Sequence, residues 1–278
     1  MEVVQSSRRL AALCRAAARE LGLVPTMGAL HDGHLALVRQ ARRENATLAV
    51  SIFINPSQFG PREDLSQYPR DLERDLELLR EEGADMVFTP DAAEMYPPGF
   101  DTWVDPGELA NRLEGANRPG HFRGVATIVT KLFNLVTPDR AYFGQKDGQQ
   151  LAVIRRLVRD LGMGLEIVAV PTVREADGLA MSSRNLYLTP DQRQAAPVVY
   201  RALASAERLW QQGVTDAQRL RQETRRVLQQ EALIERIDYV SVADADSLEE
   251  LEVVEGRAMV SVAVQLGQPR LIDNIILE

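Results

Sequence analysis

Short apolar runs alternate with amphipathic segments through the first two thirds of the chain. Runs that suit buried strands occur at 21–24, 47–54, 86–89, 141–143 and 166–170. Between them, apolar residues recur at helical spacing over 34–44, 72–79, 125–136 and 148–161. Strands that alternate with helices in this way pair in parallel, so the pattern predicts an α/β fold with a doubly wound parallel sheet. Ligands of such sheets bind beyond the carboxyl ends of the strands.

The pattern changes after about residue 173. Two helical stretches, 190–212 and 215–230, are followed by three strand-like runs at 237–242, 257–264 and 271–276. Helices followed by strands are typical of an α+β domain. We therefore expect one domain over 1–173 and a smaller C-terminal α+β domain over 174–278.

The first twenty residues read as an amphipathic helix that carries interleaved arginine and glutamate. This segment lacks the uninterrupted apolar core of a signal peptide. The apolar runs of the chain are all far shorter than a membrane span. Cys14 is the single cysteine, which excludes an intrachain disulfide and fits a reducing cytoplasm. We expect a cytoplasmic protein with no membrane partner, in which Cys14 packs inside a helix.

Composition narrows the possible partners further. The chain of 278 residues is 45% hydrophobic and 26% charged, which is ordinary for a soluble globular protein. Its net charge of -8 argues against a general nucleic-acid binder, which needs a basic face. It does not exclude a small anionic substrate, because the local field in a cleft can oppose the net charge.

Two of the three histidines lie in one turn, within the string Pro-Thr-Met-Gly-Ala-Leu-His-Asp-Gly-His at 25–34. Gly28 and Gly33 lack a Cβ, so backbone N–H groups can approach an anion closely. The helix expected to begin near Gly33 offers unpaired N–H groups and a positive dipole end. His31 and His34 add donors where charge builds up during nucleotidyl transfer. The turn therefore favours nucleotide phosphate binding over a structural turn. No further His or Cys nearby completes a metal site.

A polar loop follows the second strand, where the chain reads Asn-Pro-Ser-Gln-Phe at 55–59. The Gln58 amide both donates and accepts hydrogen bonds, which suits a hydroxy acid. By itself, such a glutamine is more often an ordinary polar residue of a loop.

The strand at 141–143 ends in Gly-Gln-Lys-Asp, residues 144–147. Lys131 and Lys146 are the only lysines among 32 basic residues, which hints that a compact ammonium is needed. A lysine near a helix N-terminus is unfavourable for the helix dipole, so Lys146 suits an anion shared with that terminus. Asp147 either caps the helix or binds ribose hydroxyls.

Two further loops carry groups that suit anions. The segment 118–124 holds His121 and Arg123 among glycines, and it is either a solvated turn or an anion contact. The string Met-Ser-Ser-Arg-Asn at 181–185 is either an ordinary loop or a clamp on a triphosphate.

The HxGH form of the histidine turn resembles the signature of the nucleotidylyltransferase superfamily, which includes class I aminoacyl-tRNA synthetases. The longer string at 25–35 resembles the pantothenate synthetase (pantoate–β-alanine ligase) family, as do the motifs at 55–59, 144–150 and 181–185. The segment Glu63-Asp64-Leu65…Tyr68-Pro69-Arg70 also matches. Two positions depart from the family pattern: Gln145 stands where glutamate is usual, and Gly148 where an aromatic is usual.

The resemblance implies a Rossmann-like fold and ATP-dependent condensation of pantoate with β-alanine through pantoyl adenylate. It implies catalytic roles for His31, His34 and Lys146, and contact of pantoate or β-alanine with Gln58 and Gln150. It further implies Mg²⁺ with ATP, with metal ligands left open, and a homodimer. The ATP-binding positions that it implies are Met27, Gly28, His31, Gly33, His34, Gly144, Gln145, Lys146, Asp147, Val173, Met181, Ser182, Ser183 and Arg184.

Two other functions compete with this interpretation. One is a plain nucleotidyltransferase, which adenylylates a phosphate compound and stops. The other is a non-catalytic module that senses nucleotides. Gln58 and Gln150 favour an uncharged hydroxyl substrate over a phosphorylated one, and the several charge-stabilising residues disfavour a sensing module.

Overall fold

The computed structural model describes residues 1–60 and 65–278, and the chain divides into two compact units. The first unit consists of Met1–Gly144 and Val153–Val170, and the second of Gln145–Ala152 and Pro171–Glu278. Helix α7 (Gly148–Asp160) therefore begins in the second unit and continues in the first. The expected division into 1–173 and 174–278 places the whole of this helix in the first domain.

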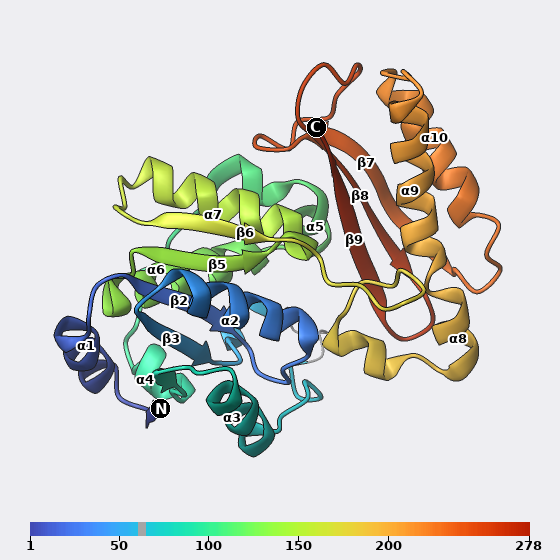
Figure 1. Cartoon of the computed structure of the whole chain (residues 1–278). Helices are drawn as coiled ribbons and strands as arrows, with labels where there is room; N and C mark the ends of the chain where they lie inside the picture. Colours follow the sequence, from blue (N-terminus) through green and yellow to red (C-terminus); the bar gives the residue numbers. More distant parts are fainter. Residues whose placement is uncertain (61–64) are drawn as a thin grey trace. The chain divides into compact units, whose positions relative to one another are not determined.

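The first unit contains a sheet of six parallel strands in the order β1-β4-β3-β2-β5-β6, of which Figure 1 labels β2, β3, β5 and β6. This confirms the predicted α/β fold with a parallel sheet. The strand order reverses between β2 and β5, and such a reversal is where doubly wound sheets bind ligands. The strands are β1 (Glu2–Val4), β2 (Leu21–Thr26), β3 (Thr47–Ile52), β4 (Met86–Phe88), β5 (Arg140–Gly144) and β6 (Glu166–Val170).

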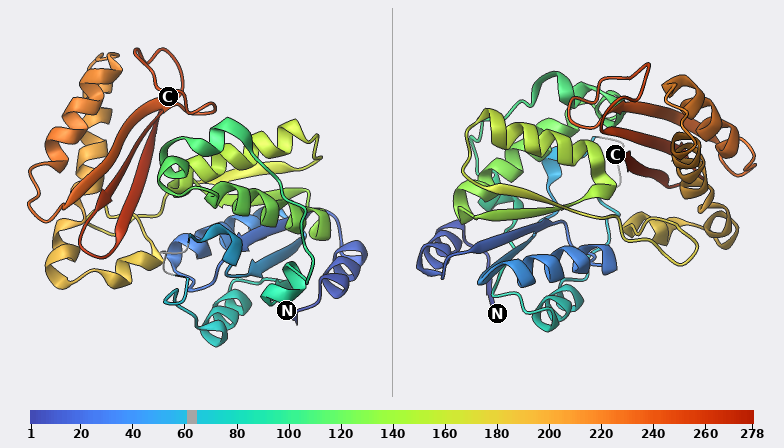
Figure 2. Two further views of the ribbon diagram at one scale, coloured as in Figure 1. Left: turned by 180° about the vertical axis from the view of Figure 1, so that it is seen from behind. Right: turned by 45° about the horizontal axis from the view of Figure 1, so that its top comes forward.

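Helices cover both faces of this sheet (Figures 1 and 2). Helix α2 (Asp32–Glu44) contacts β2, β3 and β5, and its buried Leu35, Val38 and Ala41 share one core cluster with Val24. Helix α6 (His121–Val136) contacts β2 and also α1 (Ser7–Ala16). The remaining helical elements are η1 (Pro56–Gln58), α3 (Leu72–Glu81), α4 (Ala92–Met95), η2 (Gly107–Asn111) and α5 (Leu113–Asn117).

The N-terminal segment corrects one prediction. The expected single helix over the first twenty residues is a strand, β1, followed by the shorter helix α1. Strand β1 pairs in parallel with β4, whose partners Met86–Phe88 are distant in the sequence. Cys14 is buried in α1, as predicted.

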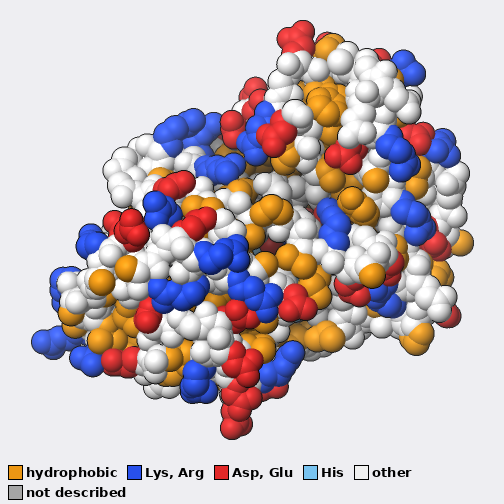
Figure 3. Space-filling model, in the orientation of Figure 1, with side chains coloured by type: hydrophobic (Ala, Val, Ile, Leu, Met, Phe, Trp, Pro, Cys, Tyr) orange, Lys and Arg blue, Asp and Glu red, His pale blue; other side chains and the backbone are white. Residues whose placement is uncertain are grey.

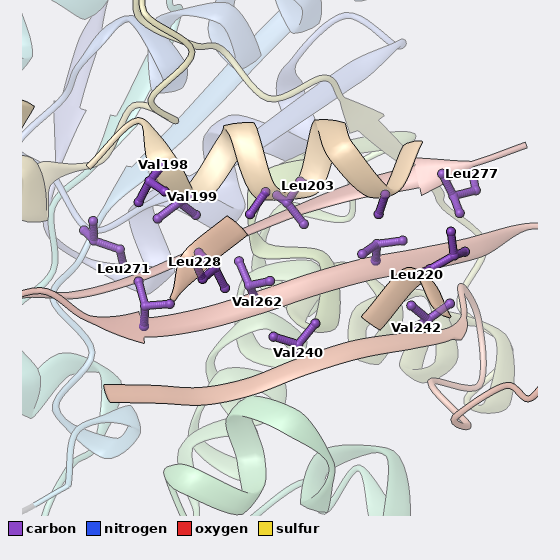
Figure 4. Packing of buried hydrophobic residues seen from close by; sticks show 14 of the residues in the cluster. Val198, Val199, Leu203, Leu220, Leu228, Val240, Val242, Val262, Leu271 and Leu277 are labelled. Carbon is purple, nitrogen blue, oxygen red and sulfur yellow. The ribbon is translucent and has the colours of Figure 1, made fainter. Parts of the chain in front are cut away.

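The second unit packs helices on a three-stranded antiparallel sheet, β7 (Arg236–Asp244), β8 (Ala258–Gln265) and β9 (Arg270–Leu277). Figure 4 shows Val198 and Leu203 of α9 (Val198–Gln211) facing Val262 of β8 and Leu271 of β9. Helix α10 (Ala217–Leu228) adds Leu220 and Leu228 to this core. The other helical elements of this unit are η3 (Gln145–Asp147), η4 (Ser183–Tyr187) and α8 (Pro190–Ala195).

The predicted helix over 190–212 is two helices, because α8 ends at Ala195 and α9 begins at Val198. Pro197 stands at the N-cap of α9. Proline has no N–H, and its ring clashes with the carbonyl of the residue four positions earlier, so a continuous helix is broken there.

Lys and Arg side chains are interspersed with Asp and Glu over the face drawn in Figure 3. Among the described residues, no helix combines the length and the apolar character needed to cross a membrane.

Candidate active site

The histidine turn follows β2, next to the point where the strand order reverses. His31 is the N-cap of α2, and its Nδ1 accepts the Gly33 N–H at 3.1 Å. His34 Nδ1 in turn accepts the His31 N–H at 3.4 Å, which completes a capping box built from two imidazoles. The ring centroids lie 4.1 Å apart. A ring nitrogen that accepts carries no proton, so the ring proton of each histidine is on Nε2.

A buried carboxylate holds the backbone just before these histidines. Asp75 on α3 accepts the N–H groups of Ala29 and Leu30, both at 2.8 Å. Gly28 and Ala29 have positive φ of 81° and 51°, a conformation that only glycine adopts without cost. Burial raises the pKa of Asp75, against the lowering effect of the Leu30 and Ala29 hydrogen bonds. Asp75 is therefore part of the turn's architecture.

These contacts correct one expectation about the turn. Unpaired N–H groups were expected at the helix start, yet the N–H groups of Gly33 and His34 bond to His31. The N–H of Gly28 lies 3.3 Å from the Thr26 hydroxyl. The imidazole Nε2–H groups are therefore better suited to an incoming phosphate than the backbone of this turn.

The Gln58 loop lies at the carboxyl end of β3. Gln58 is buried, with 8% of its surface exposed, and its carbonyl accepts the His121 Nδ1–H at 2.8 Å. Arg118 Nη1 lies 3.1 Å from the other ring nitrogen of His121. The third histidine thus contacts the backbone of a predicted site residue. The motif residues Glu63 and Asp64 lie outside the described part of the chain.

The Lys146 turn belongs to the second unit and is attached to β9. Asn274 Nδ2 donates to the carbonyls of Gln145 and Lys146, at 3.0 and 2.8 Å. Gln145 Nε2 donates to Asn274 Oδ1 at 3.0 Å. Both carbonyls can only accept, so the NH₂ group of Asn274 must face them and its oxygen must face the side chain of residue 145. Glutamine at this position donates a hydrogen bond to that oxygen, which an ionised glutamate could not do. This contact explains the Gln145 departure.

The Gly148 departure also has a local reason. A Cβ at Gly148 would lie 2.5 Å from the Met259 sulfur and 3.0 Å from Asn274 Nδ2. The neighbouring strands of the second unit therefore fill the space that a larger side chain would need. Gln149 beside it is buried, whereas Gln150 is half-buried.

The loop with the two serines is fixed to the same strand. Arg174 forms a bidentate pair with the buried Asp273 of β9, at 2.6 and 3.1 Å, and stacks on the Tyr200 ring. The Met181 N–H donates to the Val173 carbonyl at 3.0 Å, which joins the two ends of this loop. The Ser182 hydroxyl accepts the Arg184 N–H at 3.3 Å.

Three predicted residues of the second unit, Lys146, Ser182 and Arg184, line one pocket. Arg270 and the paired Asp273 also line it. The Lys146 ammonium lies 3.4 Å from the Asp147 carboxylate. A pocket with two arginines, a lysine and a hydroxyl suits a polyphosphate.

The comparisons with known proteins agree on one family. The model of the pantoate-beta-alanine ligase family matches residues 1–276. The chain belongs to this family. It is 60% identical over 258 residues to the pantothenate synthetase of Roseiflexus castenholzii, covering 93% of this chain and 92% of that protein. The family assignment makes the chain an enzyme of the ligase class and confirms the resemblance of its motifs.

Solved structures of the pantoate–β-alanine ligase family share the fold. The pantothenate synthetase of Thermus thermophilus superposes with a TM-score of 0.93 at 50% identity, over 99% of both chains. The pantoate–β-alanine ligase of Francisella tularensis, described in complex with β-γ ATP and β-alanine, superposes with a TM-score of 0.81 at 32% identity, over 99% of this chain and 97% of that one.

Sequence reasoning missed the residues that orient the motifs. Asp75, Tyr96 and Asn274 lie far along the chain from the turns they contact. Asp75 alone left a signal, because it sits four residues before the buried Leu79, on the apolar face of α3.

Proposed function

We propose that this chain condenses (R)-pantoate with β-alanine to form pantothenate, with ATP converted to AMP and pyrophosphate. This reaction belongs to pantothenate and coenzyme A biosynthesis. The full-length family match and the relative described with β-γ ATP and β-alanine support the proposal. The observation that carries it is the His31–His34 pair, whose two Nε2–H groups stand at the end of β2.

In the first step, a carboxylate oxygen of pantoate attacks the α-phosphorus of ATP. The bond from this phosphorus to the oxygen that bridges to the β-phosphorus breaks, and pyrophosphate leaves. Negative charge grows on the phosphate oxygens during this exchange. The Nε2–H groups of His31 and His34 and the Lys146 ammonium stabilise that charge.

In the second step, the β-alanine amine attacks the acyl carbon of pantoyl adenylate. The carbon–oxygen bond to the phosphate breaks, AMP leaves, and the amine nitrogen loses a proton as the amide forms. Activation first makes the acyl carbon a better electrophile before the amine arrives, so no side chain need act as a nucleophile.

The binding assignments follow the motifs. Gln58 and Gln150 contact pantoate. Closure of the loop that carries Ser182, Ser183 and Arg184 over the phosphates excludes water, which would hydrolyse the adenylate. The other ATP contacts are the positions implied by the family resemblance: Met27, Gly28, Gly33, Gly144, Gln145, Asp147, Val173 and Met181.

Mg²⁺ accompanies ATP in this proposal and neutralises phosphate charge. The described residues contain no group of three or more His, Cys, Asp or Glu side chains able to hold a metal. In the proposal, phosphate oxygens and water hold this cation, as is usual for Mg²⁺ in nucleotide sites. The proposal also includes a homodimer, which the family resemblance implies, and a location in the cytoplasm, which the single cysteine favours.

The exchange of labelled pyrophosphate into ATP tests the proposed function. We expect exchange when pantoate and Mg²⁺ are present and β-alanine is absent, because adenylation does not need the amine. With β-alanine added, AMP and pyrophosphate should form in equal amounts, together with pantothenate.

Other outcomes point to other functions. ADP as a product would mean attack at the γ-phosphorus and an acyl phosphate intermediate. Exchange without pantoate would favour a plain nucleotidyltransferase. ATP binding with neither exchange nor turnover would favour a sensing module.

A further inference from the structure

Hydrogen bonds around Asn55 determine which end of the Gln58 amide faces the site. Asn55 follows β3 and is 1% exposed. Its Nδ2 lies 3.2 Å from the Gly124 carbonyl, and its Oδ1 lies 3.3 Å from the Ser57 N–H. The carbonyl can only accept and the backbone N–H can only donate, so these two groups permit one orientation of the Asn55 amide.

The orientation of Asn55 sets that of Gln58. Asn55 Nδ2 is 2.9 Å from Gln58 Oε1, and the nitrogen must donate, so the oxygen of Gln58 accepts there. The opposite end of the Gln58 amide is therefore its NH₂ group. Rotation of this amide by 180° would bring the NH₂ groups of Asn55 and Gln58 together, and neither could accept a hydrogen bond from the other.

The Gln58 NH₂ group has only a weak acceptor in the described part of the chain. Its nitrogen lies 3.2 Å from the sulfur of Met27, and thioether sulfur accepts hydrogen bonds weakly. Met27 belongs to the histidine turn. A carboxylate or hydroxyl oxygen of a ligand is a stronger acceptor than this sulfur.

Tyr96 reinforces the arrangement from the other side. Its hydroxyl lies 2.8 Å from Asn55 Oδ1 and 2.9 Å from the Ser57 hydroxyl, which is itself 2.8 Å from Asn55 Oδ1. The hydroxyls of Tyr96 and Ser57 share two protons among these three contacts. If one hydroxyl donates to the other, the second donates to Asn55 Oδ1, so Asn55 Oδ1 always accepts at least one of these hydrogen bonds. The Tyr96 ring packs against Phe100 and Trp103, which fixes the position of its hydroxyl.

The backbone of Gln58 is held as firmly as its side chain. The His121 ring donates to the Gln58 carbonyl, and Arg118 Nη2 lies 3.5 Å from the same oxygen. Helix α6 packs directly on this backbone, since a Cβ at Gly124 would lie 2.5 Å from the Ser57 carbonyl oxygen and 2.8 Å from Gln58 Cα.

We infer that Tyr96, acting through Asn55, is a positioning residue that holds the Gln58 amide with its NH₂ group toward the acid substrate. The site then accepts ligands that offer a lone pair at this point, such as a carboxylate, and discriminates against a donor there. This inference rests on the proposed function, in which Gln58 contacts pantoate.

Two substitutions test the inference through steady-state kinetics. Tyr96→Phe removes only the hydroxyl, and we expect the KM for pantoate to rise about 3- to 10-fold, as for loss of one buried hydrogen bond. We expect the KM for ATP to stay within twofold. Gln58→Glu replaces the NH₂ group by a second oxygen, which repels a carboxylate. We expect a rise in the KM for pantoate of about 100-fold or more.

Tyr142→Phe is the matched control. The Tyr142 hydroxyl is also buried and bonds to Asn45 and Glu44, away from the Gln58 loop. We expect this control to lower the melting temperature and to leave the KM for pantoate unchanged. A general loosening of the fold would therefore affect the control as well as Tyr96→Phe.

The outcomes separate this inference from the proposed function. Absence of pantoate-dependent turnover in the unsubstituted enzyme would overturn the proposed function, and the assignment of pantoate with it. Normal turnover with an unchanged pantoate KM in Gln58→Glu would show that the carbonyl end faces the substrate. An unchanged pantoate KM in Tyr96→Phe would remove Tyr96 from its positioning role. Either of the last two results overturns the inference and leaves the function standing.

Discussion

Each imidazole of the His31–His34 pair has two nitrogens with different tasks. The Nδ1 atoms accept backbone N–H groups and cap α2, while the Nε2–H groups are the donors that we propose for phosphate charge. Removal of either histidine by alanine would combine a loss of capping with a loss of transition-state stabilisation. The two tasks need substitutions that remove one nitrogen at a time.

Asparagine and glutamine at position 34 separate the two tasks. The Oδ1 of His34→Asn can replace Nδ1 as the capping acceptor, but this side chain is too short to donate where Nε2 stands. We expect a melting temperature within about 2 °C of the unsubstituted enzyme and a loss of pyrophosphate exchange on the order of 100-fold. His34→Gln reaches the Nε2 position with its NH₂ group. Glutamine also serves as the capping partner three residues after the N-cap, as Gln192 does for Thr189 in α8, so we expect this variant to be about as stable as His34→Asn and to retain more exchange.

Calorimetry and isotope exchange on the same preparations provide the measurement. Equal exchange in the two variants would mean that the position of the donor does not matter. Exchange that falls only in proportion to a lowered melting temperature would assign His34 to the fold alone.

The residues that we propose to carry chemistry could be selected from the sequence because they cluster within short strings after strands. His31, His34, Gln58 and Lys146 all lie in such strings. The atom each residue presents could not be predicted, because it depends on partners from distant parts of the chain. The Gln58 amide is one example, since Tyr96 comes from a separate segment nearly forty residues later.

At the scale of elements, β9 holds the two loops of the second unit to which we assign phosphate contacts. Asn274 binds the backbone of the Lys146 turn, and the adjacent Asp273 binds Arg174 of the loop that leads to Ser182. Successive side chains of a strand usually point to opposite faces, so two neighbouring residues can each bind a different loop. The position of Lys146 thus depends on a strand near the C-terminus.

Asn274→Ala tests this dependence. It removes both donors to the Gln145 and Lys146 carbonyls, and we expect the KM for ATP to rise about 10-fold as the Lys146 turn loosens. Ser261→Ala is the matched control, because Ser261 pairs with Asn274 in the β8–β9 register and its buried hydroxyl has no hydrogen-bond partner among the described residues. Steady-state kinetics with varied ATP measure the effect. An equal rise in both variants would mean that damage to the sheet, and not the turn contact, is responsible.

Element boundaries were predictable where one signal dominated. Strand β6 has the predicted bounds, 166–170, because its apolar run ends at a proline. The break at Pro197 was missed because apolar residues continue at helical spacing on both sides of it. Strand β1 was missed because three residues carry no periodicity of their own, and only pairing with β4 makes them a strand.

At the scale of the molecule, each unit has its own buried core. One core gathers α2 and α3 on the parallel sheet, and the other gathers α9 and α10 on the antiparallel sheet. The proposal assigns pantoate contact to Gln58 of the first unit and phosphate contact to Lys146 of the second. Ligands that bind the folded chain stabilise it by mass action, so each of the two assignments predicts a rise in melting temperature when its ligand is added.

We expect pantoate and α,β-methylene ATP each to raise the melting temperature of the enzyme. This nucleotide analogue cannot release pyrophosphate, so no adenylate forms during the measurement. At one hundred times the dissociation constant, a ligand contributes about 2.7 kcal/mol, or roughly 5–10 °C for a chain of this size. Gln58→Ala should abolish most of the pantoate shift and keep the nucleotide shift, while Lys146→Ala should do the reverse. Differential scanning calorimetry measures both shifts. Loss of both shifts together in either variant would show that the substituted residue supports the fold of both sites and is not a contact to one ligand.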